Sequence, residues 1–225
     1  MHIPDGFLNN KAALGLLAGA LGMMGYCLGR VFKAVGVLIG NLAGNNGQKI
    51  AGIMGFSKNA DKYFQKLAMI SVWVFAAQMF NIPIASSTSA HLIGGVFAAV
   101  LAGPFAGFVI ISSVLAIQAV FFADGGLLAL GANILNMAFI GSFLSYFVYK
   151  ALSAKNYYAA VIAACFFSVL AAALACLIEI SISGAVSFSA AFKDMMSLHL
   201  LFAVLESALT LLLLKVFKNL GGANE

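Results

Sequence analysis

Long apolar stretches alternate with short polar segments along the whole chain. A helix needs about 20 mostly apolar residues to cross a bilayer, and seven stretches approach that length. The third is too short to cross upright, so it is either a half-span or the core of a longer segment. The pattern predicts an all-α, polytopic membrane protein with about seven transmembrane helices. The expected spans are 8–29, 67–82, 91–103, 105–123, 133–149, 157–179 and 196–217.

The composition agrees with this class and excludes a soluble domain. Of the 225 residues, 63% are hydrophobic and only 8% are charged, whereas soluble domains carry about 25% charged residues. We expect a single membrane domain, 1–225. Its longest polar interruption, 41–66, is predicted to be a loop with some helix. The net charge of +5 does not indicate nucleic-acid binding, because the basic residues lie between apolar stretches.

The positions of Lys and Arg predict the orientation in the membrane. Cytoplasmic loops carry an excess of these residues. With the amino terminus outside and seven spans, ten of the 12 basic residues fall inside, and only Lys11 and Lys193 fall outside. The carboxyl terminus and the 41–66 loop are then cytoplasmic. The predicted outer face holds Met1, the 83–91 loop, Asp124 and the 180–195 loop.

The start of the chain, MHIPDGFLNN, is expected to belong to the mature protein. A secretory signal has a basic start and a small-residue cleavage site. Here no basic residue precedes Lys11, and Pro4 and Asp5 interrupt the segment. Initiator methionine is removed mainly before small residues, so the bulky His2 predicts that Met1 is retained with a free amine.

His2 stands at a position that suits metal chelation. A terminal amine, the amide nitrogen of residue 2 and the Nδ1 of a histidine there can hold one ion, because they close a five-membered and a six-membered ring. A deprotonated amide ligand favours a square-planar site, which suits Ni(II) or Cu(II). Taken alone, a histidine at position 2 is more often an ordinary exposed residue. A fourth nitrogen would complete the plane, and His91 is the best placed candidate.

All three histidines fall toward the outer side in this orientation. His91 ends the 83–91 segment, which we interpret as an outer loop of the metal site. The alternative for His91 is a packed imidazole beside a helix capped by Ser89. His199, near the outer end of the last span, could pair with a polar group in the bundle instead of touching the metal. Glu206 is an intramembrane acid, which marks a functional candidate but could equally hold helices together.

Further polar residues near the outer side are candidates for supporting roles. Asp124 precedes two glycines in a predicted tight turn. Asn133 and Asn136 enter the fifth span, where an unsatisfied polar group is costly. Their expected use is hydrogen bonding that orients the imidazoles, or loop closure. The candidates for support around the metal are Ser89, Asp124, Asn133, Asn136 and His199.

Common enzyme motifs are missing from the sequence. Neither GxxxxGKS nor GxxxxGKT occurs, so we expect no ATP binding through a P-loop. The metalloprotease motif HExxH and the hydrolase motif GxSxG are also missing. Nothing in the sequence therefore resembles a membrane protease or a hydrolase.

Three ordered blocks point to a known family. They are the start MHIPDGFL, the run SSTSAHLIGGVFAAVLAGPFAG and the run QAVFFADGGLLALGANILNMAFIG. Together they resemble the CbiM/NikM family, the substrate-capturing S components of energy-coupling factor (ECF) transporters for cobalt and nickel. The resemblance covers the start and about residues 80–141, and HLLFAVLESALT near the carboxyl end extends it.

The resemblance implies a seven-helix fold with the amino terminus outside. It also implies a metal held by the Met1 amine, the amide nitrogen and imidazole of His2, and the imidazole of His91. His199 falls on a tail motif that does not supply a direct ligand in the family. Two departures, a longer 41–65 loop and a tail without the glycines that often precede its Glu, bear on partner docking. Cobalt-type members often carry CSHP at the second histidine and a His in place of the acid before GG. Here the sequence reads SAHL and ADGG, which favours nickel.

We therefore expect the substrate-binding subunit of an ATP-driven uptake transporter for Ni²⁺ or Co²⁺ in a bacterial or archaeal cell membrane. On this interpretation the chain binds the ion and is not an enzyme, so it has no catalytic residues and no catalytic cofactor. The family implies three kinds of partner: a transmembrane coupling component, cytoplasmic ATPase subunits and a small accessory membrane subunit. One alternative is a self-sufficient channel or secondary carrier, which would need polar residues along several spans. A second is a membrane enzyme in which the three histidines and Glu206 converge.

Overall fold

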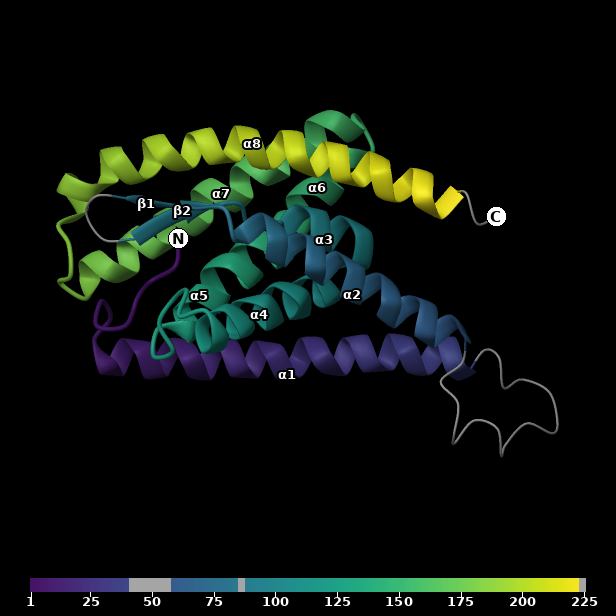
Figure 1. Ribbon diagram of the computed structural model, residues 1–225, viewed down its shortest axis with the longest axis horizontal. Coiled ribbons are helices and arrows are strands. Elements are labelled where there is room, and N and C mark those ends of the chain that lie inside the picture. Colours follow the sequence, from purple (N-terminus) through teal and green to yellow (C-terminus); the bar gives the residue numbers. More distant parts are fainter. Residues whose placement is uncertain (41–57, 85–87, 223–225) are drawn as a thin grey trace.

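The computed structural model describes residues 1–40, 58–84 and 88–222. Within these ranges the chain forms seven continuous helical segments, the number that the apolar pattern predicts. They run side by side as an elongated bundle (Figure 1). They are α1 (Asn10–Gly40), α2 (Lys58–Gln78), α3 (Gly95–Ala102), α4 (Pro104–Phe121), the joined α5 (Leu130–Ile134), η1 (Leu135–Leu144) and α6 (Ser145–Ser153), α7 (Tyr157–Ile182) and α8 (Phe188–Gly222).

Five of these described segments are long and apolar enough to cross a membrane: α1, α4, the joined α5–η1–α6, α7 and α8. α3 has eight residues, about 12 Å of helix, so the predicted third span is indeed too short to cross. α2 begins in a polar stretch and ends at Gln78, so the predicted second span stops short of residue 82. Residues 58–66 of the predicted 41–66 loop belong to this helix, and 41–57 lie outside the described residues.

The 83–91 segment differs from the predicted loop. Strand β1 (Asn81–Ile84) pairs with strand β2 (Thr88–His91) in an antiparallel hairpin, with Asn81 opposite His91 and Ile84 opposite Thr88. Isoleucine and threonine favour extended backbone, and an extended chain has no helical period to detect. The all-α prediction therefore needs this small two-stranded sheet added to it.

One end of the bundle collects segments that are far apart in the sequence. The amino terminus, the β1–β2 hairpin, the α4–α5 connection and the α7–α8 turn lie there (Figure 1). The carboxyl end of α1, the start of α2 and the carboxyl end of α8 lie at the opposite end. This grouping is the one that the positions of Lys and Arg predict.

The start of the fifth helix lies directly against α1. A Cβ atom at Gly131 would overlap the backbone of Leu17, so only glycine allows the two helices to approach this closely. The close approach brings α5, and Asn133 within it, beside the amino-terminal segment. α1 itself exposes apolar side chains such as Leu14 and Leu21, as expected of a helix that faces lipid.

Replacing Gly131 by alanine should lower the thermal stability of the detergent-solubilised protein. Overpacking of a tight contact costs about 1–3 kcal/mol, because the α1 or α5 backbone must shift. The matched control is Gly22→Ala, at an exposed site on α1 where an added Cβ meets nothing within 4 Å. Equal melting temperatures for the two variants would contradict the close approach.

Candidate metal centre

The first residues of the chain are buried in the end of the bundle rather than free in solvent. Met1 and Ile3 are fully buried, and His2 is only 4% exposed. Burying backbone without partners is costly, so the segment needs hydrogen bonds from its surroundings. The contacts that supply them come from β2, the α4–α5 connection and α5.

Asn133 of α5 holds the backbone of Ile3 from both sides. Its Oδ1 accepts the Ile3 N–H at 2.8 Å, and its Nδ2 donates to the Ile3 carbonyl at 3.2 Å. The Gly126 N–H also donates to that carbonyl, at 2.9 Å. The Thr88 hydroxyl donates to the carbonyl of His2 at 2.9 Å. Asn133 thus has a supporting role, but it orients backbone rather than an imidazole.

Asp5 is a second anchor, and it is not among the residues predicted for the site. Its carboxylate accepts the backbone N–H groups of Leu127, Leu128 and Ala129, at 3.1, 2.8 and 3.3 Å. These groups lie just before or at the start of α5, where free N–H groups attract a carboxylate. An acid near the chain start was visible in the sequence, but its partners, more than 120 residues away, were not.

The two glycines after Asp124 leave room for this segment. Gly125 has a φ of 85°, and a Cβ there would lie 2.6 Å from the Nδ1 of His2. A Cβ at Gly126 would overlap Asp5. The Asp-Gly-Gly turn predicted from the sequence is therefore also the place where the amino-terminal segment crosses the α4–α5 connection.

The structure brings His2 and His91 together. Their ring centroids are 4.6 Å apart with a 45° angle between the planes. The Nδ1 of His91 lies 2.7 Å from the carbonyl of Leu92, to which it can only donate, so Nε2 carries the lone pair. Nε2 is buried and has no hydrogen-bond partner among the described residues. This is the state in which an imidazole binds a metal ion.

Burial keeps the nitrogens of this centre unprotonated at neutral pH. It lowers the pKa of the Met1 amine to about 5, and this outweighs the opposite effects of Cys176 and Asp124. Burial, followed by the nearby amine, lowers the pKa of His2 to about 3. The same causes in the same order hold the pKa of His91 well below its usual value. The amine and both imidazoles therefore have lone pairs free to bind a cation.

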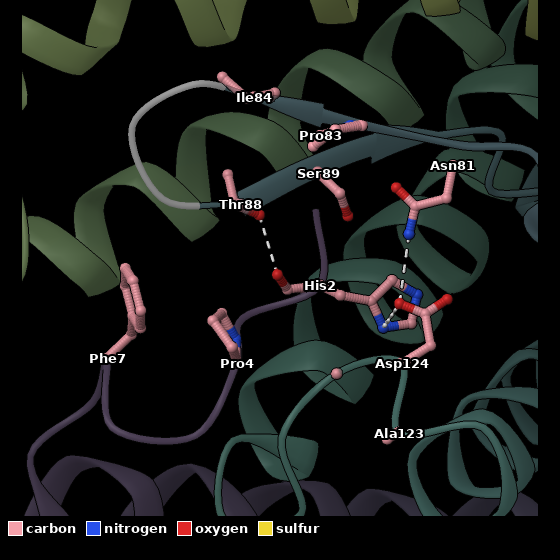
Figure 2. A pocket seen from close by; sticks show the side chains of 11 residues that line it. His2, Pro4, Phe7, Asn81, Pro83, Ile84, Thr88, Ser89, Ala123 and Asp124 are labelled. Atoms are coloured by element: carbon pink, nitrogen blue, oxygen red, sulfur yellow. Dashed lines mark hydrogen bonds and ion pairs between the residues drawn. The ribbon is translucent and has the colours of Figure 1, made fainter.

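A cavity of about 590 Å³ leads to His2. Figure 2 shows the His2 ring close beside the carboxylate of Asp124. The Nδ1 of His2 is 3.9 Å from Asp124 Oδ1, which accepts a hydrogen bond from Asn81 at 3.2 Å. Partial burial raises the pKa of Asp124 above its usual value, although the Asn81 hydrogen bond opposes this. Ser89 lines the same cavity.

The other candidate residues lie around this centre in different roles. Asn136 donates to Glu179 at 2.6 Å rather than to an imidazole. His199 is buried and directs its Nδ1 to the Met195 carbonyl at 2.7 Å. Glu206 accepts hydrogen bonds from the backbone that follows His91. Glu206 thus binds backbone rather than an imidazole, and among the described residues no cluster joins it to the three histidines as the enzyme alternative requires.

Side chains alone do not build a metal site in this structure. Among residues 1–40, 58–84 and 88–222, no group of three His, Cys, Asp or Glu side chains is placed to hold a metal ion. A site at His2 and His91 would therefore need further ligands from the backbone, and the Met1 amine and the His2 amide are the nitrogens available there.

The family follows from comparison with known proteins. The family model described as "Cobalt uptake substrate-specific transmembrane region", CbiM, matches residues 2–221. The chain belongs to the CbiM family. The family is a transport family, so this chain is a multi-pass membrane protein of that family.

Relatives of this CbiM chain carry nickel or cobalt in their names. A relative from Archaeoglobus fulgidus that carries the name fused nickel transport protein NikMN is 34% identical over 212 residues. These residues are 93% of this chain and 63% of that protein. The cobalt transport protein CbiM of Thermosipho melanesiensis is 33% identical over 166 residues, 74% of this chain and 61% of that protein. The chain thus spans less than two thirds of the length of these curated relatives.

Two crystal structures share the CbiM fold seen here. A truncated transition metal transporter superposes with a TM-score of 0.80 at 30% identity, over 97% of this chain and 99% of that one. A second structure, of a transition metal transporter, gives the same TM-score and identity over 98% of this chain and 93% of that one. The arrangement of the bundle is therefore shared over almost the whole chain.

Replacing Asn133 by alanine should weaken nickel binding about 10–100-fold, the range found for groups that orient metal ligands. The change leaves the Ile3 N–H without its acceptor and removes one donor to the Ile3 carbonyl, which frees the backbone beside His2. Isothermal titration calorimetry with Ni²⁺ measures the loss. Asn156→Ala is the control, because Asn156 caps α7 through the Ala159 N–H. Equal losses in both variants would contradict the anchoring role.

If the Met1 amine and the His2 amide are ligands, Ni²⁺ binding at pH 7 should release about one proton per ion, from the amide. An amine with the ordinary pKa of 8.0 would be mostly protonated and would release nearly a second proton. Because burial lowers the pKa of the Met1 amine to about 5, that nitrogen is already free. The Ni²⁺ affinity should lose the contribution of the Met1 amine only when the pH falls through about 5, because the amine is protonated below that pH. Calorimetry in buffers of different ionisation enthalpy counts the protons, and a value near two would contradict the low pKa.

Proposed function

We propose that the chain is the substrate-binding membrane subunit of an ATP-driven, ECF-type uptake transporter for Ni²⁺ or Co²⁺. The observation that carries the proposal is the burial of the Met1 amine, which lowers its pKa to about 5, beside the imidazoles of His2 and His91, whose ring centroids are 4.6 Å apart. Membership of the CbiM family and the nickel and cobalt transport names of its relatives support it. The metal is cargo that the subunit captures, and it takes part in no chemistry of the protein.

The proposed ligands are four nitrogens. Three come from the chain start: the Met1 amine, the His2 amide and the His2 Nδ1. The fourth is the Nε2 of His91, which is buried and without a partner among the described residues. Thr88 and Asn133 fix the peptide group that follows His2, the first through the His2 carbonyl and the second through the Ile3 N–H, which lowers the entropic cost of forming the two chelate rings. Four nitrogens including an amide anion suit a square-planar ion, and we propose nickel first.

The proposed orientation places the amino terminus outside and the carboxyl terminus in the cytoplasm. The excess of Lys and Arg at the opposite end of the bundle supports it. The ion would then enter through the cavity at His2, where the carboxylate of Asp124 attracts cations. Residues 1–10 form the binding segment, the β1–β2 hairpin occludes the ion, and 41–66 lies on the cytoplasmic side.

Release requires partners, in this proposal. Toward the opposite end of the bundle, Phe97 of α3 packs on Phe217 of α8 at 5.2 Å between ring centroids. This aromatic contact stands in the way of a cation at that point, which argues against a self-sufficient channel or secondary carrier. We propose that a transmembrane coupling component, cytoplasmic ATPase subunits and a small accessory membrane subunit supply the reorientation that opens the site inward.

Inserting one alanine between Met1 and His2 should abolish tight nickel binding. The amine then no longer closes a five-membered ring with the His2 amide, and it no longer fits its buried position. We expect Ni²⁺ affinity to fall on the order of 1,000-fold, or about 4 kcal/mol. Calorimetry on protein with a native, untagged amino terminus measures the change.

The matched control for this insertion is one alanine added at the carboxyl end, which should leave the affinity unchanged. Chemical acetylation of the amine should reproduce the loss without changing the sequence. Tight Ni²⁺ binding that survives either the insertion or the acetylation would show that the amine is not a ligand.

A further inference from the structure

A buried carboxylate on α8 has no part in the proposed ligand set. Glu206 is only 2% exposed, and its two oxygens have separate partners. Oε2 accepts the Ile93 N–H at 2.9 Å, and Oε1 accepts the Gly94 N–H at 2.8 Å. A buried acid is costly in a membrane protein, so these two hydrogen bonds are a large part of what makes the position tolerable.

The partners of Glu206 belong to the turn that begins immediately after His91. In this turn, residues 92–94, the chain leaves β2 and enters α3, and Gly94 takes a φ of 70° to make the bend. A second buried side chain, Gln78 of α2, donates to the Ile93 carbonyl at 2.7 Å. The backbone of the turn is therefore fixed from α8 on one side and from α2 on the other.

The same turn determines the direction of the His91 ring. The Nδ1 of His91 lies 2.7 Å from the carbonyl of Leu92, the first residue of the turn. That hydrogen bond fixes both the tautomer and the ring rotation, and so points Nε2 toward the centre. A continuous chain of hydrogen bonds and backbone thus leads from Glu206 through Ile93 and Leu92 to the proposed fourth ligand.

We infer that Glu206 is a positioning residue for the metal centre, with Gln78 as its companion, and that it holds the imidazole of His91 in the geometry that completes the nickel site. This inference rests on the proposed function. Glu206 touches neither the ion nor its ligands, and acts by fixing the 92–94 turn. When the carboxylate is lost, the three nitrogens of Met1 and His2 still bind, and water replaces the His91 nitrogen.

The same contacts would also exist if Glu206 only fastened α8 to α3, and the two roles differ in a spectroscopic result. A site with four nitrogens absorbs visible light at shorter wavelength than one with three nitrogens and a water oxygen, because nitrogen is the stronger-field ligand. A role in packing alone would change the melting temperature and leave the nickel absorption band in place. A positioning role moves the band.

The test is Glu206→Gln with Ni²⁺ as the probe. Glutamine keeps the size but turns an NH₂ group toward one of the two backbone N–H donors, so one hydrogen bond is lost. We expect the absorption band to move to the position found in His91→Ala, and Ni²⁺ affinity to fall about 10–100-fold. Ser207→Ala, which removes a hydroxyl bonded to the Ala203 carbonyl within α8, should keep the wild-type band.

Gln78→Met tests the same turn from α2 and keeps the test decisive if Glu206→Gln does not fold. It removes the donor to the Ile93 carbonyl at similar side-chain volume, and the same band shift is expected. Suppose that the folded Glu206→Gln and Gln78→Met proteins keep the wild-type band while His91→Ala shifts it. That result would overturn the positioning role of Glu206 and leave the proposed ligand set standing. A wild-type band in His91→Ala would overturn the proposed ligand set and the inference with it.

Discussion

The hydrogen bonds between the side chain of Asn133 and the backbone of Ile3 are the constraint on which the candidate centre depends. A chain terminus normally lies in water, where its charge and its backbone groups are solvated. Here Met1 is fully buried, and the next peptide groups need protein partners in place of water. Asn133 supplies an acceptor and a donor to the same residue, much as a neighbouring strand would. Without it, the Ile3 N–H would be buried with no acceptor, and the segment would depend on the hydrogen bonds of Thr88, Gly126 and Asp5.

Burial of the terminus has a chemical consequence as well as a structural one. The environment that excludes water from Met1 also disfavours its ammonium form, and the pKa falls to about 5. Protons are the commonest competitors for a nitrogen ligand, so the interactions that hold the segment also remove that competition. Binding geometry and ligand availability thus have one physical cause, which is the desolvation of the first residues.

The sequence predicted the bundle better than the centre. Apolar length gave the helical segments and the short α3, because a bilayer sets a fixed length for a spanning helix. The positions of Lys and Arg correctly grouped Met1, the 83–91 segment and Asp124 at one end. His2 and His91 were chosen from local chemistry, and the structure places them in contact. The hairpin was missed, since four-residue strands in a polar run leave too weak a period to recognise.

The anchors Asp5 and Glu206 show why the rest of the centre could not be read from the sequence. Each carboxylate binds backbone N–H groups more than 100 residues away. Backbone N–H groups are chemically alike at nearly every position, so the amino-acid sequence does not show which N–H groups lack a partner in the fold. Only the packing of α1 on α5, or of α8 on α3, decides that, and packing depends on the whole fold.

The two halves of the proposed centre are held by separate parts of the scaffold. Asn133 and Asp5 fix the chain start against α5 and its connection, whereas Glu206 and Gln78 fix the turn after His91 between α8 and α2. The Thr88 hydroxyl of the hairpin donates a hydrogen bond to the His2 carbonyl and so links the two halves directly. An ion bound to nitrogens of both halves would add a much stronger link between them. In the proposed function, capture therefore joins the two halves, and release requires that they separate.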